Sequence, residues 1–331
     1  MHTESPIFCQ SVRIHSEADG LFRRLWVSLF VGNSYLCEAL GRQKSRSRFI
    51  ENPIIDMKEA LTLVKVGGKI VENEASLSAL LTAFNAIRGP KLLVHGGGRT
   101  ATDVASRLGI ETHMVGGRRI TDAAMLDVVT MVYGGLVNKR VVAGLQARGI
   151  NAVGLTGADM DVMRSRRRPV VRMADGTEVD YGFVGDVEAV DGQRLADLIR
   201  SGVTPVLAPL THDGMGSLLN TNADTIAGEA AKALAQHYDV SLVFCFEHAG
   251  VLADPEDETS VIHHIGRADF ARLVADGVVA GGMIPKIENS LAAVEAGVAR
   301  VIITRADALA QTLVQDEQKD DAGFNIGTII S

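Results

Sequence analysis

From about residue 61 onward, the sequence alternates short β-branched runs with longer stretches whose apolar residues recur every three or four positions. The first pattern is typical of buried strands, and the second is typical of helices that pack one face against a core. Alternation of the two predicts βαβ units, whose strands run parallel. The sequence therefore predicts an α/β fold, a mostly parallel sheet covered by helices on both faces.

The predicted elements follow from these periods. Strands are expected at Leu61–Val66, Lys91–His95, Asn151–Leu155, Thr204–Leu207, Val240–Cys245 and Ala299–Thr304. Helices are expected at Glu74–Arg88, Ala101–Leu108, Asp122–Arg148, Asp191–Ser201, Asn222–His237, Arg267–Asp276 and Lys286–Ala296. Two Gly- and Arg-rich interruptions are predicted to be hairpins or loops at the sheet edge, namely His113–Arg119 and Arg164–Arg172.

Composition restricts the class of partner. The formal net charge of −7 argues against a general nucleic-acid binder, because such proteins collect basic surface to meet the phosphate backbone. A small-molecule substrate is expected instead. Cys9, Cys37 and Cys245 lack the spacing of a metal site and cannot all pair, which fits a reducing cytosol. We therefore expect a cytoplasmic protein without a structural disulfide.

Residues 1–56 differ from the rest and contain a short apolar run at 25–32 behind two arginines. The run is too short to span a bilayer, so no membrane partner is expected. A secretion signal is one interpretation, although no small-residue cleavage site follows. An amphipathic oligomerisation helix is a second. The favoured interpretation is an upstream extension from a mistaken start, with Met57 as the natural beginning.

Two lysines are set among glycines in the α/β region. Lys65 ends a predicted strand and is followed by Gly67 and Gly68, whereas Lys286 follows a glycine pair and begins a predicted helix. Ligands bind at the carboxyl ends of strands in such sheets, and glycine lets backbone N–H groups approach phosphate oxygens. Either lysine alone would also suit an ordinary surface position. Together they predict phosphoryl transfer, whose transition state spreads negative charge over several oxygens.

Further anion-binding signals follow other predicted strands. The segment His95-Gly-Gly-Gly opens a helix, so its N–H groups suit an anion. Its match to a dinucleotide fingerprint is weak, because no acidic residue closes a second strand at the required distance. Arg118 and Arg119 precede another helix, and one of them could hold a carboxylate, although such arginines are more often solvated.

The segment from Asn220 to Asp224 lies at a predicted strand-to-helix junction. Plain helix capping by Asn222 is the simplest interpretation. The functional interpretation is that Asn220 binds the substrate while Asp224 holds the lysines as an ion-paired carboxylate. The nine histidines include no helical pair at metal spacing, so no protein metal site is expected. The motifs together predict a kinase for a small anion.

These motifs, in this order, closely resemble those of the acetylglutamate kinases within the amino acid kinase family. They are Lys65-Val-Gly-Gly, His95-Gly-Gly-Gly, Gly117-Arg-Arg-Ile-Thr, Asn220-Thr-Asn-Ala-Asp, Gly281-Gly-Met-Ile-Pro-Lys and Ile326-Gly-Thr. The resemblance runs from about Leu61 to the C-terminus. It implies a three-layer αβα sandwich with a mainly parallel central sheet, the amino acid kinase fold. It also implies a lobe at 57–236 that binds acylglutamate, a lobe at 237–331 that binds ATP, and a homodimer or a larger hexamer.

The same resemblance assigns roles to single residues. Lys65 and Lys286 would stabilise the transferring phosphoryl group, and Asp224 would organise both lysines. The acylglutamate would be held by Gly97, Gly98, Arg119 and Asn220. ATP with Mg²⁺ is the expected nucleotide, and no dedicated metal ligands are expected because Mg²⁺ usually rides on the phosphates. The residues expected near the nucleotide are Gly67, Gly68, Glu247, His248, Ala249, Gly250, Val251, Leu252, Val278, Val279 and Ala280.

The chain departs from the family pattern at two places. The family usually has a Thr/Ser-Asp-Val segment where this chain has Phe246-Glu-His, and Pro where this chain has Arg99. A third feature, Thr156-Gly-Ala-Asp-Met followed by an arginine cluster, resembles a branch linked to N-succinylglutamate. The second carboxylate of a succinyl group would require an extra cation.

The resemblance implies transfer of the γ-phosphoryl group of ATP to the side-chain carboxylate of N-acetyl-L-glutamate. The product would be N-acetyl-L-glutamyl 5-phosphate, on the way to arginine or ornithine. A glutamate carboxylate, with a reference pKa of about 4.3, is already ionised at neutral pH and needs no general base. An N-succinyl-L-glutamate kinase and a non-catalytic, amino-acid-sensing protein of the same fold stay open as alternatives.

Overall fold

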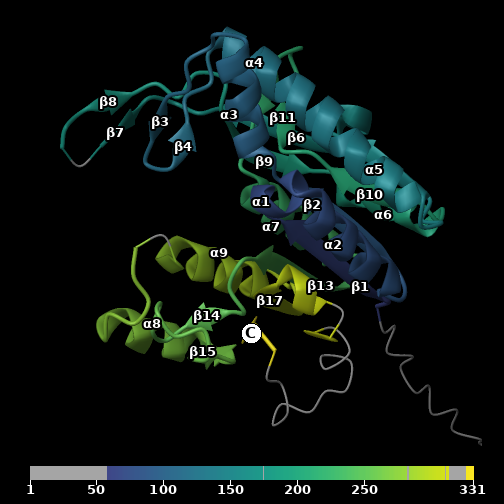
Figure 1. Ribbon diagram of the computed structural model, residues 1–331, viewed down its shortest axis with the longest axis vertical. Coiled ribbons are helices and arrows are strands. Elements are labelled where there is room, and N and C mark those ends of the chain that lie inside the picture. The colour runs from purple at the N-terminus through teal and green to yellow at the C-terminus, as the bar shows by residue number, and fades with distance from the viewer. Residues whose placement is uncertain (1–57, 174, 282, 310, 313–325) are drawn as a thin grey trace, which may run out of the picture. The chain divides into compact units, whose positions relative to one another are not determined.

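The computed structural model describes residues 58–331 apart from 174, 282, 310 and 313–325 (Figure 1). Contacts divide the chain into two units, Met1–Ile55 and Asp56–Ser331, and the described residues belong to the second. Our interpretations of residues 1–56, and of Met57 as the natural start, concern residues outside the described part. Both predicted lobes lie within the second unit, and their separate ligands stay predictions.

An eight-stranded sheet forms the centre of the described part, in the order β16-β18-β17-β13-β1-β2-β10-β5. Of its described pairings, β17 with β18 is antiparallel and the rest are parallel. The mainly parallel sheet is therefore confirmed. Its strands are β1 (Ala60–Val66), β2 (Lys91–His95), β5 (Ala152–Leu155), β10 (Thr204–Leu207), β13 (Asp239–Phe246), β16 (His264–Ile265), β17 (Arg300–Arg305) and β18 (Thr328–Ile330).

Helices cover both faces of this sheet, as the sandwich requires (Figure 1). Neighbouring residues of β1 show the division, because Leu63 packs into one apolar cluster and Val64 into the other. Side chains alternate across a strand, so a sheet buried on both faces needs apolar residues at consecutive positions. On the Val64 face lie α2 (Glu74–Ala86), α3 (Gly98–Arg107), α4 (Ala123–Val129) and α5 (Asn138–Gln146). On the Leu63 face lie α6 (Gly192–Arg200), α7 (Ala223–Leu234), α8 (Arg267–Ala275) and α9 (Met283–Glu295).

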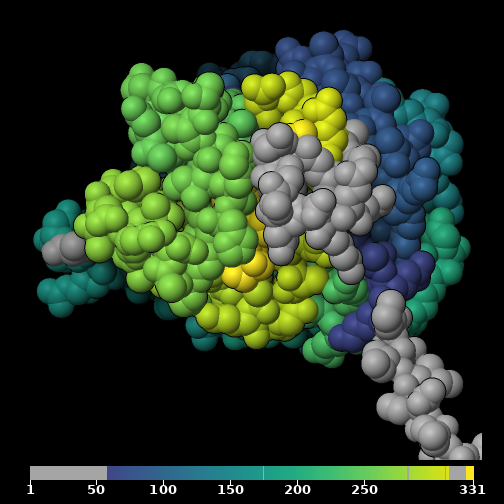
Figure 2. Space-filling view, turned by 90° about the horizontal axis from the view of Figure 1, so that it is seen from below, coloured from purple at the N-terminus to yellow at the C-terminus, as the bar shows by residue number. Residues whose placement is uncertain are grey.

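The elements from β13 onward gather on one side of the sheet. Strands β13, β17, β18 and β16 are consecutive neighbours, and β13 adjoins β1 of the earlier half. Seen from below, the green to yellow residues of these elements fill much of the visible face, beside the blue and teal residues of the earlier half (Figure 2). The boundary between β1 and β13 therefore brings together residues that are far apart in the sequence.

The long helix predicted over Asp122–Arg148 is interrupted. Between α4 and α5 the chain forms a π-helix at Thr130–Val137, which contains a glycine pair. Helices of this kind are rare and frequently lie at functional sites. The buried ring of Tyr133 lies so close to Gly97 that a Cβ at residue 97 would be 3.1 Å from Tyr133 Cδ1. The π-helix thus shapes the wall next to the predicted substrate glycines.

A smaller sheet was missed by the sequence analysis. Its order is β12-β11-β6-β9. The segment Arg164–Arg172 was predicted as a hairpin or loop, but its first part belongs to β6 of this sheet, and only its end, in β7, pairs with β8 as a hairpin. The arginines hid the strand because only its inward residues, Met163 and Ser165, are buried. The strands of this sheet are β6 (Met163–Arg167), β9 (Gly185–Val190), β11 (Leu210–His212) and β12 (Leu218–Asn220). Strands β7 (Val171–Arg172) and β8 (Glu178–Val179) form a separate antiparallel pair.

The other predicted interruption is confirmed as a hairpin of β3 (Met114–Val115) and β4 (Arg118–Arg119). The remaining short elements are α1 (Gly68–Glu72), β14 (Val251–Leu252), β15 (Val261–Ile262) and 3₁₀ turns at Asp159–Asp161 and Ala306–Ala308. Cys245 is a buried free thiol, and burial raises its pKa to about 12. The other two cysteines lie outside the described residues.

A buried polar network fixes the end of β2. The His95 ring is fully buried, with Nδ1 2.8 Å from the Gly96 carbonyl and Nε2 3.1 Å from the amide nitrogen of Asn138. That amide also donates to the Val206 carbonyl at 3.0 Å. The ring therefore donates from Nδ1 and accepts at Nε2, as only a neutral histidine can. Burial lowers the pKa of His95 to about 4, and the network joins β2, α5 and β10.

This burial predicts an acid-sensitive stability. The unfolded chain binds a proton at His95 below its ordinary pKa of 6.5, whereas the folded chain does so only near 4. The stabilising contribution is therefore fully present above 6.5 and is lost as the pH falls toward 4. Lowering the pH from about 7 to about 5 should reduce the free energy of unfolding of both proteins. We expect this reduction to be about 2 kcal/mol smaller in His95→Gln than in the wild type. Urea denaturation at both pH values measures it, and equal losses in the two proteins would contradict it.

Candidate active site

The carboxyl ends of β1, β2 and β13 form the floor of the site. In the sheet register, Val66 lies opposite His95 on one side and Cys245 on the other. The turns that follow β1 and β2 carry the predicted glycines, and Phe246 is the last residue of β13. Because these strand ends are neighbours in the sheet, the motifs meet at one edge although they are separated by up to half of the sequence.

Lys65 and Asp224 form the central ion pair. Lys65 is 6% exposed, and its Nζ lies 2.5 Å from Asp224 Oδ1. Asp224 stands in the first turn of α7, where Asn222 caps the helix by accepting hydrogen bonds from the backbone N–H groups of Asp224 and Thr225. Among the described residues, Lys65 is the only cation that reaches this buried carboxylate oxygen. Of the two lysines that Asp224 was predicted to hold, the structure pairs it with Lys65, whereas no ion pair of the described residues joins it to Lys286.

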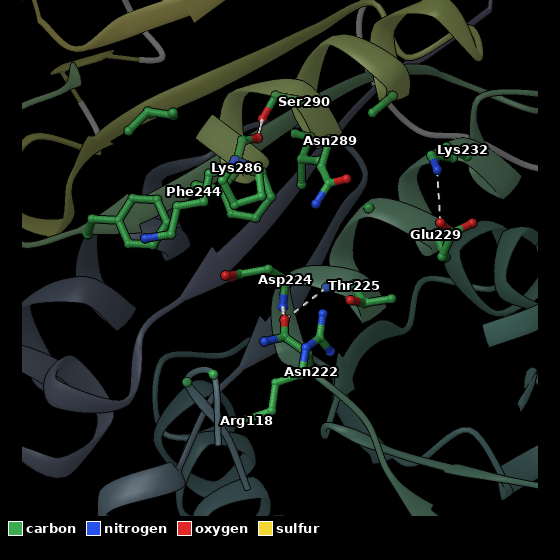
Figure 3. A pocket seen from close by; sticks show the side chains of 18 residues that line it. Arg118, Asn222, Asp224, Thr225, Glu229, Lys232, Phe244, Lys286, Asn289 and Ser290 are labelled. Atoms are coloured by element: carbon green, nitrogen blue, oxygen red, sulfur yellow. Dashed lines mark hydrogen bonds and ion pairs between the residues drawn. The ribbon is translucent and has the colours of Figure 1, made fainter. Parts of the chain in front are cut away.

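Lys286 of α9 lies near the Lys65–Asp224 ion pair. It stands in the first turn of α9, and its Nζ lies 4.3 Å from the ring centroid of Phe246. Lys65 Nζ lies 5.3 Å from that centroid. Figure 3 shows Lys286 and Phe244 on one side of a pocket and Asn222 and Asp224 across from them. The structure therefore brings the two predicted lysines together, around one aromatic ring.

The pocket between these residues has a volume of about 290 Å³. Its walls come from α7 and α9, and its apolar floor includes Phe244 and Phe246. A second cavity of about 220 Å³ adjoins it and shares Arg118 and Asn222 with the first. The second cavity is lined by the predicted substrate residues Gly97, Gly98, Arg119 and Asn220.

Close backbone contact explains the glycines of these turns. A Cβ at Gly96 would lie 3.1 Å from the backbone nitrogen of Gly68, and a Cβ at Gly68 would lie 3.6 Å from that of Gly97. The turn after β1 and the turn after β2 therefore pack backbone against backbone. A side chain at residue 96 would crowd the backbone of Gly68, so the two turns would have to move slightly apart. The α3 N-terminus, which begins at Gly98, leaves backbone N–H groups for an anion.

The predicted substrate side chains are held in place by hydrogen bonds. Arg119 donates to the Gly98 carbonyl and to Thr102 Oγ1, both at 2.8 Å. Asn220 donates from its amide to Thr121 Oγ1 at 3.0 Å. Fixed donors of this kind suit a substrate carboxylate, because little ordering is left for the binding step.

The residues predicted near the nucleotide do not line one cavity, unlike the predicted substrate residues. Glu247 pairs with Lys69, and His248 Nδ1 lies 2.7 Å from Glu258 Oε1. Val251 and Val279 are 2% exposed and pack in the core. Gly67 and Gly68 lie beside the turn after β2, but the described linings of the two cavities contain none of the predicted nucleotide residues. Their nucleotide contacts stay predictions.

Three residues of the site were missed as functional candidates or given no specific role. Phe246 was noted only as a departure from the family, Arg118 only as one of two arginines, and Tyr133 not at all. Tyr133 lines the substrate cavity, and burial raises its pKa. Phe246 could have been found from its position, because it ends β13 beside the strand that carries Lys65. Tyr133 had no local signal in the sequence.

The arrangement supplies positive charge and backbone N–H groups at two adjoining cavities. Phosphoryl transfer needs these features more than covalent help from the protein. In the described ranges, no group of three or more His, Cys, Asp or Glu could hold a metal ion. Nor does any helix of those ranges have the length and apolar character needed to cross a membrane.

A mainly parallel αβα sandwich with one lysine at the end of a strand and a second in the first turn of a facing helix is the arrangement of a kinase that phosphorylates a small molecule. Residues 60–305 match the profile described as the amino acid kinase family. The chain belongs to this family.

Relatives of known name match most of the folded region. An acetylglutamate kinase of Bacteroides thetaiotaomicron is 66% identical over 253 residues, covering 76% of this chain and 96% of the relative. That of Cytophaga hutchinsonii is 51% identical over 259 residues, covering 78% and 96%. That of Methanopyrus kandleri is 40% identical over 249 residues, covering 75% and 96%.

Solved structures share the fold at low identity. The N-acetylglutamate synthase of Neisseria gonorrhoeae, complexed with coenzyme A and N-acetyl-glutamate, has a TM-score of 0.67 at 22% identity, over 83% of this chain and 60% of that one. The carbamate kinase of Giardia lamblia bound to AMP-PNP has a TM-score of 0.58 at 14% identity, over 83% and 98%. At such identities the likeness shows the fold alone, and it confirms the predicted amino acid kinase fold.

The buried ion pair predicts that removing one of its charges destabilises the fold more than removing both. Asp224→Asn leaves the Lys65 ammonium group buried without a counter-charge, so we expect the free energy of unfolding to fall by about 1–3 kcal/mol. Adding Lys65→Met removes the unpaired charge, and the double variant should regain part of that loss. Urea denaturation of the wild type, both single variants and the double variant measures the coupling. Additive effects of the two substitutions would contradict it.

Proposed function

We propose that this protein is an acetylglutamate kinase. It transfers the γ-phosphoryl group of ATP to the side-chain carboxylate of N-acetyl-L-glutamate and forms N-acetyl-L-glutamyl 5-phosphate for arginine and ornithine biosynthesis. The observation that carries the proposal is that Asp224, paired with Lys65, and Lys286 line a cavity that adjoins the one lined by Arg119 and Asn220. The names of relatives that match over 96% of their length support the choice of substrate.

The chemistry needs no proton acceptor. The side-chain carboxylate of the substrate is ionised at neutral pH, so its oxygen can attack the γ-phosphorus directly while the bond to the ADP oxygen breaks. Negative charge then spreads over the γ-phosphoryl oxygens, and the ammonium groups of Lys65 and Lys286 stabilise it. Asp224 holds Lys65 in position and offsets part of its charge in the absence of substrate.

The two ends of the acylglutamate have separate contacts in this proposal. Arg119 and Asn220 hold the amino-acid part, and Gly97 and Gly98 let it lie close to the backbone. The turns at Gly68 and Gly96 pack closely, so that a Cβ on Gly96 would lie 3.1 Å from the Gly68 nitrogen, and such side-chain-free turns suit phosphate oxygens. Mg²⁺ that enters with the nucleotide phosphates would neutralise part of their charge.

Several finer statements belong to the same proposal. The nucleotide lies near the predicted segments around Glu247–Leu252 and Val278–Ala280, and the enzyme acts in the cytoplasm. It forms the homodimer that the family resemblance implies, with a hexamer as the larger alternative. The dimer and the nucleotide contacts are expectations from the resemblance, and size-exclusion chromatography with light scattering tests the first of them.

Lys286 provides the sharpest test of the catalytic roles. Its charge is needed most when the phosphoryl group is in transit, so Lys286→Ala should lower kcat by roughly a hundredfold or more and change KM for acetylglutamate much less. ADP release under saturating ATP measures both constants. Arg272→Ala, which removes an exposed cation of α8 that pairs with Asp269, is the control and should retain normal turnover. Near-normal kcat in Lys286→Ala would refute the assigned role.

N-succinyl-L-glutamate is a second candidate substrate, favoured by one observation. Arg118 lines both cavities, and among the described residues no hydrogen bond or ion pair holds its guanidinium group. The arginine cluster that first suggested a succinyl substrate is otherwise engaged, since its members pair with carboxylates. The pairs are Arg164–Asp161, Arg166–Glu188, Arg167–Asp180 and Arg168–Asp186.

Substrate comparison separates these candidates. If Arg118 meets a second carboxylate, Arg118→Ala should lower kcat/KM for N-succinylglutamate roughly tenfold more than kcat/KM for N-acetylglutamate. An ADP-release assay with both acylglutamates, glutamate and aspartate measures the ratios. Equal losses of kcat/KM for both acylglutamates would argue against N-succinylglutamate as the substrate. Binding of an amino acid without turnover of any substrate would instead identify a non-catalytic sensor.

A further inference from the structure

We propose that Phe246 is a positioning residue for phosphoryl transfer, whose ring holds the ammonium groups of Lys65 and Lys286 at the reacting site. The inference rests on the proposed kinase function for its catalytic consequence, but the contact itself is a property of the folded chain. Phe246 is the last residue of β13, and it was assigned no role beyond a departure from the family pattern.

The geometry is that of two cations on one ring. Lys286 Nζ lies 4.3 Å from the ring centroid of Phe246, and Lys65 Nζ lies 5.3 Å from it. Both distances are within the about 6 Å over which an aromatic ring attracts an ammonium group through its quadrupole. The ring itself is supported by Phe244, with the two centroids 5.9 Å apart and the planes 7° apart. Phe246 is thus a fixed surface rather than a loose side chain.

The charges at the site explain why Lys65 and Lys286 need the Phe246 ring. Two ammonium groups repel each other, and lysine loses considerable rotamer freedom when it is held in one place. Asp224 offsets the charge of Lys65, but in the described part of the chain Lys286 has no carboxylate partner. Among the residues of that part, the Phe246 ring is the only cation–π, hydrogen-bond or ion-pair partner of its ammonium group. Without the ring, nothing described here would hold Lys286 close to Lys65.

A neutral ring serves this purpose better than a second carboxylate would. A carboxylate beside Lys286 would neutralise the charge that the transferring phosphoryl group needs. The aromatic face attracts the ammonium group weakly and leaves its full positive charge available to the phosphoryl oxygens. Asp224 therefore holds the buried Lys65 through an ion pair, and Phe246 holds the exposed Lys286 through its ring.

Packing alone is the alternative explanation for Phe246, because its ring also covers Phe244. The two explanations differ in what they predict for conservative variants. Phe246→Leu keeps an apolar side chain but removes the aromatic face, whereas Phe246→Tyr keeps the face. Phe270→Leu is a matched control, since Phe270 of α8 is also partly buried and packs on the same core cluster.

Kinetics give the first readout. We expect Phe246→Leu to lower kcat by roughly tenfold or more, with KM for the acylglutamate changed by less than about threefold. Phe246→Tyr should stay within about threefold of the wild-type kcat, and Phe270→Leu should do the same. A Phe246→Leu enzyme with kcat within about twofold of the wild type would overturn the proposal, as would equal losses in the Leu and Tyr variants.

Lysine NMR gives a second readout, which does not need catalytic activity. Protons above an aromatic face resonate upfield, so the Hε resonances of Lys286 and Lys65 should be shifted upfield in the wild type. Lys286→Arg assigns the first of them. Loss of the shift in Phe246→Leu and its retention in Phe246→Tyr would support the contact. Unshifted lysine resonances in the wild type would overturn it, whereas normal shifts in a protein that phosphorylates no acylglutamate would refute only the proposed function.

Discussion

The ion pair between Lys65 and Asp224 is the interaction on which the rest of the site depends. It joins the end of β1 to the first turn of α7, and it places a lysine in a position that is almost closed to solvent. A buried ammonium group is costly unless a carboxylate compensates it, so the sequence must supply Asp224 together with Asn222, which caps the helix that carries it.

Around that pair, the molecule holds positive charge without neutralising it fully. Lys286 stays exposed on α9 and faces an aromatic ring instead of a carboxylate. The glycine turns at Gly68 and Gly96 pack backbone against backbone, which leaves N–H groups in place of side chains. An anionic ligand therefore meets a surface whose dipoles and cations are already in position, and such preorganisation is the main source of catalysis in phosphoryl transfer.

Much of this arrangement could be predicted from the sequence, because the spacing of apolar residues along the chain indicates the strands and helices. Strands such as Lys91–His95 and Thr204–Leu207 are continuous apolar runs, and they were predicted with their observed bounds. The glycine-set lysines stood out because their chemistry recurs at several strand ends. The π-helix at Thr130–Val137 was not predictable, since a change of hydrogen-bond register leaves the apolar spacing almost unchanged.

Other features depended on contacts that no local pattern encodes. The strand β6 was concealed by its exposed arginines, whose carboxylate partners lie elsewhere in the sequence. The role of Phe246 appears only when β13 is paired with β1, which sets its ring beside Lys65. Arg118 could be noticed from the sequence, but its place on the wall of both cavities required the fold.

The central claim is that a phosphoryl group reaches the side-chain carboxylate of an N-acylglutamate, and hydroxylamine trapping tests it most directly. With ATP, Mg²⁺ and N-acetyl-L-glutamate, the acyl phosphate should be captured as a hydroxamate that accumulates in step with ADP. N-acetyl-L-glutamine, which lacks the carboxylate, should yield neither product. Release of ADP without hydroxamate, or equal ADP release with the glutamine analogue, would contradict the claim.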